Sequence, residues 1–249
     1  MKRILFTTVA LGALGLMLPA LAADLPMKAA PVVTPMYDWS GFYVGVYGGG
    51  GFGNHNINNA NGMAFPFANY TINYDSSGGI AGGEVGYNVQ SGNIVVGVEA
   101  DGFWSGIKGS DSSQFFSPAP LNANVVSIDT TKLRDGASFR ARGGIAIDRL
   151  LLFFDGGWAL GDLSHTNVNP GVGTDAFTVH RSGLAAGGGI AYAITNNILG
   201  KLEYRYYDFG RFVRNNPLNG VLPYTVDSTY SVLTIGFDYK FGGPVVAKF

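Results

Sequence analysis

The chain has 249 residues, with 16 Lys and Arg against 17 Asp and Glu, and it contains no cysteine. The near-neutral charge excludes the basic footprint of a nucleic-acid-binding protein, and the lack of cysteine excludes disulfides, thiol chemistry and cysteine-ligated metals. Glycine supplies 38 residues, about twice its usual share of roughly 7%, which favours strands over helices.

The first residues have the pattern of a secretory signal. Lys2 and Arg3 precede an apolar run that ends at Leu18, and the pattern Ala-Leu-Ala follows at 20–22, with small residues at its first and third positions. The run is shorter than the ~20 residues that a spanning helix needs, so we expect residues 1–22 to be a signal peptide. Residues 23–38 carry three prolines and little periodicity, and we expect them to form an extended periplasmic leader.

From residue 39 onward the pattern is that of β-strands. Residues 41–52 alternate large apolar side chains on one face with tyrosine and glycine on the other, at the two-residue period of a strand. Seven further segments of about 11 residues or slightly more follow, the length of a tilted transmembrane strand. We expect these strands near 79–90, 94–105, 132–147, 150–161, 180–194, 198–209 and 229–241.

Short and long connections alternate along the chain. Tight turns are predicted at 91–93, 148–149 and 195–197, where residues that tolerate turn geometry gather. The long polar connections are 53–78, 106–131, 162–179 and 210–228. This alternation is typical of a transmembrane barrel, whose short turns are periplasmic and whose long loops face outward. We therefore predict an all-β fold, an eight-stranded antiparallel up-and-down transmembrane β-barrel over residues 39–249.

The charges within each predicted strand share one parity. Lys or Arg facing lipid at mid-membrane costs about 2–4 kcal/mol, so this parity is expected to face inward, where an eight-stranded barrel has room for side chains but no wide channel. The predicted interior ion-pair network consists of Glu84, Glu99, Asp101, Arg134, Arg140, Arg142, Asp155, Lys201, Glu203, Arg205, Asp238 and Lys240.

Aromatic residues on the opposite parity gather near the strand ends, as the two interfacial girdles of a membrane barrel do. The predicted girdle residues are Phe42, Phe52, Tyr87, Trp104, Trp158, Tyr192, Tyr206, Tyr239 and Phe241. A soluble, lipocalin-like barrel also has eight strands, but it would leave these aromatic bands in water.

Four sequence segments together resemble the opacity-type small outer-membrane β-barrel proteins of alphaproteobacteria, which are related in fold to the transmembrane domain of outer membrane protein A. They are Ala-Ala-Asp-Leu-Pro at 22–26, Trp-Ser-Gly-Phe-Tyr-Val-Gly at 39–45, Lys-Leu-Glu-Tyr at 201–204 and Tyr-Lys-Phe-Gly-Gly-Pro at 239–244. The resemblance covers essentially the whole chain after residue 22. It implies an abundant surface protein of a Gram-negative envelope, described in some relatives as porin-like, as a haemin binder or as an adhesin. It also implies recognition by the barrel-assembly machinery through an aromatic C-terminal residue, for which Phe241 and Phe249 are both candidates.

Two constellations invite a catalytic interpretation. His180 and Ser182 share one strand face, as the base and nucleophile of a surface lipid deacylase would, although no acid partner is evident nearby in the sequence. Glu99 and Asp101 are paired carboxylates, as in a glycosidase, but the arginines at 140 and 142 favour ion pairing instead.

The three histidines, His55, His165 and His180, stand in or beside different outer loops without the spacing of metal ligands. Haem capture by histidines and tyrosines of the loops is therefore an alternative hypothesis that no sequence motif supports.

We expect a structural, surface-exposed outer-membrane protein with porin-like permeability as a second possibility, and neither enzymatic activity nor a cofactor. The alternatives are a haemin-binding or adhesin module and, after these, a membrane lipid deacylase. The expected partners are outer-membrane lipid, lipopolysaccharide and the barrel-assembly machinery, with no nucleic acid. The ligand of the outer loops is left open by the sequence.

Overall fold

The computed structural model describes residues 36–58, 71–117, 123–170, 173–215 and 223–242. The expected signal peptide, most of the expected leader and Phe249 lie outside this part of the chain. The strands are β1 (Gly41–Asn58), β2 (Thr71–Ser91), β3 (Ile94–Ser105), β4 (Lys108–Ser117), β5 (Ala123–Ile147), β6 (Leu150–Asn169), β7 (Gly173–Ala193), β8 (Ile198–Asn215) and β9 (Pro223–Lys240). No helix among the described residues is long and apolar enough to cross a membrane.

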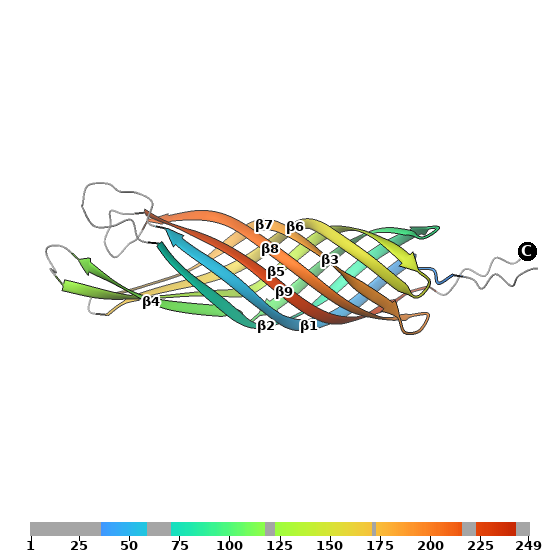
Figure 1. The fold of residues 1–249 in the computed structure, drawn as a ribbon, viewed down its shortest axis with the longest axis horizontal. Helices are drawn as coiled ribbons and strands as arrows, with labels where there is room; N and C mark the ends of the chain where they lie inside the picture. The colour runs from blue at the N-terminus through green and yellow to red at the C-terminus, as the bar shows by residue number, and fades with distance from the viewer. Residues whose placement is uncertain (1–35, 59–70, 118–122, 171–172, 216–222, 243–249) are drawn as a thin grey trace, which may run out of the picture. The chain divides into compact units, whose positions relative to one another are not determined.

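Eight of these strands close into a ring (Figure 1). Its order is β1, β9, β8, β7, β6, β5, β3 and β2, and β2 pairs with β1 again. The first and last strands pair antiparallel from Tyr43 opposite Lys240 to Asn58 opposite Thr225. Closure gives the backbone groups of each strand partners on both sides, which is what a hydrocarbon environment requires. The predicted eight-stranded antiparallel barrel is confirmed.

The ninth strand, β4, lies within the segment that we predicted as the loop 106–131. It pairs with β5 from Lys108 opposite Lys132 to Ser117 opposite Ala123, and it meets β2 only where Ser77 lies opposite Lys108. Its sequence is mostly Ser, Gly, Asp and Lys, without the apolar alternation by which a strand is recognised. β4 therefore cannot be recognised from alternating hydropathy, although its backbone pairing with β5 is regular.

Most strands also run further outward than predicted. β1 continues to Asn58 and β2 begins at Thr71, whereas the sequence pattern indicated residues 52 and 79. The extensions lie beyond the outer aromatic girdle, where a strand no longer needs an apolar outward face. The tight turns at 92–93, 148–149 and 194–197 agree with the prediction.

A shift of register in β5 corrects one predicted interior residue. The pairing of β5 with β6 shifts between Leu133 and Asp135, and a β-bulge of this kind reverses which side chains face inward. Leu133 is fully buried as a result, and Arg134 is exposed. The interior position predicted for Arg134 is wrong because the charge pattern carries no signal of the bulge.

The outward face is apolar and aromatic around the ring. All nine predicted girdle residues are exposed, and Trp104 and Trp158 are 75% and 69% exposed. At the periplasmic end the ring centroids of Phe42 and Phe241 lie 5.6 Å apart, and those of Tyr239 and Phe241 lie 5.0 Å apart. A continuous apolar belt of this kind fits the hydrocarbon core of a bilayer.

Gly86 on β2 leaves space for an interior tyrosine, and this can be tested. A Cβ atom at this position would overlap the ring of Tyr43, so we expect Gly86→Ala to lower the free energy of unfolding by about 1–3 kcal/mol through overpacking. The measurement is urea unfolding in lipid vesicles. The folded fraction at each urea concentration is read from the gel shift between unboiled and boiled samples. The control is Gly83→Ala on the lipid side of the same strand, where the nearest atom to the new Cβ is the Gly45 carbonyl oxygen at 3.5 Å. Equal stability of the two variants would contradict the packing argument.

Candidate functional site

The barrel interior holds a cluster of buried charges. Eleven of the twelve predicted network residues are buried, Arg134 being the exception. The buried residues are Glu84, Glu99, Asp101, Arg140, Arg142, Asp155, Lys201, Glu203, Arg205, Asp238 and Lys240. They come from β2, β3, β5, β6, β8 and β9, because the two-residue period of each strand directs one parity into the ring.

Arg140 is the centre of the cluster on the β5 side. Its Nη1 donates to Asp101 Oδ1 at 2.8 Å, its Nε lies 3.1 Å from Asp155 Oδ1, and its Nη2 donates to Glu99. The neighbouring Arg142 places Nη2 2.7 Å from Glu99 Oε2. Both guanidinium groups are therefore surrounded by carboxylates from β3 and β6, as buried cations need to be.

Arg205 on β8 plays the equivalent part across the barrel. Its Nη2 donates to Glu203 Oε2 at 2.9 Å and to Glu84 Oε2 at 3.1 Å. Its Nη1 donates to Asp101 Oδ2 at 3.3 Å. Asp101 thus links Arg140 and Arg205, so that a single network joins opposite walls of the ring.

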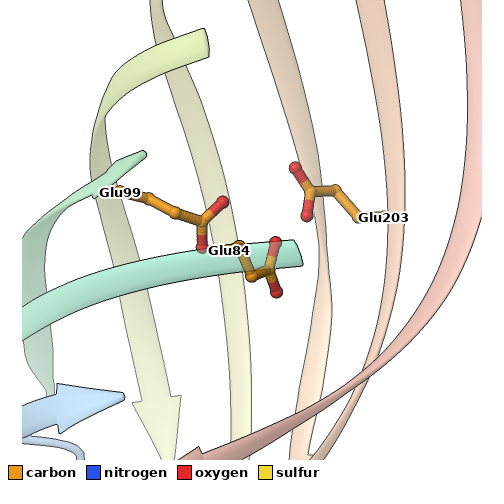
Figure 2. A group of neighbouring side chains, drawn as sticks. All are labelled: Glu84, Glu99 and Glu203. Carbon is orange, nitrogen blue, oxygen red and sulfur yellow. The ribbon is translucent and has the colours of Figure 1, made fainter. Parts of the chain in front are cut away.

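Three glutamates of this network point toward one another from β2, β3 and β8 (Figure 2). Their carboxylate oxygens lie within 4.8 Å of one another, close enough to share a metal ion. Lys201 Nζ already contacts all three, at 3.4 Å from Glu99 and 3.1 Å from Glu203, with Glu84 as its closest partner. The ammonium group occupies the place of a cation, which favours an internal ion-pair cluster over a metal centre.

Two interior tyrosines belong to the same network, and the sequence analysis missed both. The Tyr43 hydroxyl donates to Glu99 Oε2 at 2.7 Å, and the Tyr47 hydroxyl donates to Asp101 Oδ2 at 2.5 Å. The ring of Tyr47 also lies under the guanidinium of Arg205, 4.7 Å from its centroid. The alternation of residues in β1 indicates that Tyr43 and Tyr47 share one face of the strand. The predicted interior network contained charged residues only, and so it left both tyrosines out.

Two apolar layers enclose the charged cluster. The layer on the outer side consists of Tyr47, Ile80, Phe103, Ile107, Leu133, Ala159, Leu163, Ala185, Tyr207, Phe209, Tyr230 and Val232. The layer on the periplasmic side consists of Tyr37, Trp39, Val95, Ala146, Leu151, Phe153, Ala191, Ala193 and Leu199. The charged groups therefore lie between two packed layers of side chains.

The residues just before β1 close the periplasmic end. Trp39 is 1% exposed, and its Nε1 donates to the Asp148 carbonyl at 3.0 Å. The Tyr37 hydroxyl donates to the Asn196 carbonyl at 2.9 Å, and burial raises the pKa of Tyr37 to about 12, so the phenol stays a neutral donor. The last residues of the expected leader, Met36–Asp38, are thus ordered against the barrel.

Two of the three histidines lie inside the outer mouth of the barrel. His55 is buried, with Nδ1 3.0 Å from Ser228 Oγ and Nε2 2.9 Å from Ser76 Oγ. His165 is also buried, and its Nδ1 lies 2.9 Å from Thr131 Oγ1. Both imidazoles are turned into the ring and held by hydroxyl groups, so neither is presented to an incoming haem at the surface.

The third histidine, His180, lies on the outside of the barrel with an acid partner that the sequence did not reveal. Its Nδ1 lies 2.5 Å from Asp162 Oδ1 on the neighbouring strand β6. Ser182, two residues further along β7, has its side chain on the same outward face and is exposed. Antiparallel pairing of β6 with β7 brings Asp162 directly opposite His180. Asp162 lies in the segment predicted as the loop 162–179, so the sequence pattern carried no signal of this contact.

The closed ring, its charged interior and its apolar belt define a small outer-membrane β-barrel. The family model described as outer membrane protein beta-barrel domain matches residues 8–241, and the chain belongs to this family. It is therefore an outer-membrane protein of the class that the resemblance predicted, and the soluble lipocalin-like interpretation is excluded.

Relatives of the chain carry names of the same class. The 31 kDa outer-membrane immunogenic protein of Brucella melitensis is 30% identical over 89% of this chain and 93% of its own length. The 22 kDa outer membrane protein of Rhizobium leguminosarum is 32% identical over 73% of this chain and 69% of its own. Among solved structures, the outer membrane protein OprG from Pseudomonas aeruginosa is 14% identical, covers 84% of this chain and 100% of its own, and gives a TM-score of 0.46.

Removal of the central guanidinium tests the network. We expect Arg140→Met to destabilise the barrel by about 3–5 kcal/mol, since it leaves buried carboxylates without their partner. Arg211→Met is the control, because the Arg211–Asp227 pair is exposed and solvent screens a pair of this kind, so its removal is expected to change stability little. Urea unfolding of both variants in lipid vesicles makes the comparison. A loss below about 1 kcal/mol for Arg140→Met would show that the carboxylates do not depend on this arginine.

Proposed function

We propose that the chain is a structural, surface-exposed protein of the outer membrane whose interior stays closed to solutes. The observation that carries the proposal is the ion-pair network packed between two apolar layers. Opening a path through it would separate buried charges, and each uncompensated charge costs several kcal/mol. This favours a structural role over a porin-like one.

The outer part of the barrel supports the surface role. β1 continues for six residues beyond Phe52, which corresponds to roughly 20 Å of strand. The pairing of β4 with β5 is formed mostly by residues of the predicted loop 106–131. Much of the surface presented outside the cell is then regular β-structure, and the adhesin alternative would use this surface.

A deletion strain separates the structural role from the porin-like one. We expect loss of the gene to raise sensitivity to detergent while uptake of small hydrophilic solutes is unchanged, and the wild-type chain to restore detergent resistance. The purified protein is expected to give no stepwise conductance in a planar bilayer. Slower solute uptake in the deletion strain, or discrete conductance steps, would favour the porin-like role instead.

A second candidate function is ester hydrolysis at the lipid-facing surface, and the Asp162–His180 hydrogen bond favours it. Asp162 binds Nδ1 of His180, which leaves Nε2 free to take a proton from Ser182, as in a Ser-His-Asp arrangement. Ser182 would attack the ester carbonyl of an acylated lipid, and the lipid alcohol would leave with the proton that His180 took from Ser182. Water would then cleave the acyl-serine, releasing the fatty acid and returning the proton to Ser182. This candidate ranks second because no hydrogen bond joins Ser182 to His180 among the described residues, and the backbone around Ser182 is engaged in strand pairing.

The hydrolase candidate predicts release of fatty acid from outer-membrane lipid by the purified barrel. We expect Ser182→Ala and His180→Asn to abolish the release. Ser164→Ala is the matched control. Ser164 is also a serine with an accessible side chain, but its hydroxyl forms a hydrogen bond with Thr178 on β7 and not with a histidine. Mass spectrometry of lipid from cells with each variant gives the readout. Identical acylation with and without the chain would end this candidate without touching the structural role.

A further inference from the structure

Three basic side chains lie together on the outer surface of the barrel. Lys108 follows the buried Ile107, and Lys132 lies between the buried Thr131 and Leu133, so strand alternation directs both lysines outward. They are direct partners in the pairing of β4 with β5, which sets their Cβ atoms about 4.5–5.5 Å apart. Arg134 lies two residues from Lys132 on β5 and is also exposed.

In the part of the chain that the structure describes, acids do not neutralise these charges. Like charges directly opposite each other weaken a β-sheet, and a compensating acid would be expected beside the two lysines. Acids in the neighbourhood are Asp75 on β2, Asp135 next to Arg134 on β5, and Asp162, which pairs with Asp135 from β6. Among the described residues none of the three bases forms an ion pair, and Asp162 is bound to His180. Elsewhere on the outer surface Arg211 does have such a partner, in Asp227.

The height of these bases relative to the membrane follows from the strand register. Trp104 of the outer girdle lies opposite Asp135 on β5, so Arg134 is one residue beyond the girdle and Lys132 three residues beyond it. At about 3.3 Å per residue along a tilted strand, the three bases lie within roughly 10 Å of the girdle. This is the headgroup zone of the outer leaflet, where the anionic groups available are the phosphates of lipids.

We propose that Lys108, Lys132 and Arg134 bind the phosphate groups of an outer-leaflet lipid and hold it against β4 and β5. A guanidinium binds phosphate through paired hydrogen bonds, and the two ammonium groups add point charges beside it. The phosphate supplies the negative charge that the opposed lysines lack among the residues described. The bulge between Leu133 and Asp135 has a use in this arrangement, because it turns Arg134 from the barrel interior to the lipid surface.

The test uses the full chain folded in micelles of an uncharged detergent. The probes are bisphosphorylated lipid A, the same lipid without phosphates, and inorganic phosphate, each titrated against tryptophan fluorescence. Trp104 lies in the girdle beside the three bases and reports binding there. The variant is Lys132→Gln/Arg134→Gln. The matched control, Arg149→Gln/Arg211→Gln, removes the same charge from the periplasmic turn and from the Arg211–Asp227 pair.

We expect the wild type and the control to bind the phosphorylated lipid, and the Lys132/Arg134 variant to bind it at least about tenfold more weakly. The lipid without phosphates is expected to bind no better to the wild type than to the variant. Equal binding of the phosphorylated lipid to wild type and variant would overturn the proposal. Full displacement of the lipid by millimolar inorganic phosphate would identify a free-phosphate site and would overturn the lipid assignment.

A second measurement separates ligand binding from a role in folding. In lipid-free micelles Lys132→Gln is expected to leave the unfolding temperature unchanged or to raise it, because the substitution removes repulsion from Lys108. A lower unfolding temperature would mean that Lys132 stabilises the fold through contacts within the protein. That result would overturn the proposal that it serves to bind lipid phosphate. The proposal requires only that the barrel spans the membrane, so a conducting or an enzymatic barrel would leave it standing.

Discussion

The backbone of a strand in lipid must find all its hydrogen-bond partners within the protein. In this chain that constraint is met by the pairing of β1 with β9, which turns a sheet into a ring. Once the ring is closed, each strand has one face toward hydrocarbon and one toward a narrow interior. The placement of charges, aromatic residues and glycines in the sequence follows from this division.

The interior combines a charged centre with apolar layers on both sides. Burying Arg140 and Arg205 is costly, and only the convergence of several carboxylates on each offsets the loss of water. Apolar side chains of similar volume would fill the same space. The charged centre instead ties β3, β5 and β8 to particular partners, and it penalises registers in which one charge would be left alone.

Much of this architecture could be predicted because residue types alternate with a two-residue period along each strand segment of the sequence. Parity alone placed Glu99, Arg140 and Lys201 inside, and it placed the girdle residues outside. Parity fails where the backbone inserts a residue, as it does before Asp135. Hydropathy fails beyond the membrane, where β4 forms a regular ladder from polar residues. The contact between Asp162 and His180 depends on the register between two strands, which neither signal reports.

The segment before β1 is held by residues from three different periplasmic turns. The Trp39 amide donates to Gln90 at the start of the first turn, the Tyr37 amide donates to Asp148 in the second, and the Tyr37 hydroxyl donates to Asn196 in the third. These acceptors come together only when all the hairpins have formed. Docking of the segment is therefore a late event in assembly, and a barrel with a missing or slipped hairpin would keep this part of the chain accessible to periplasmic proteases.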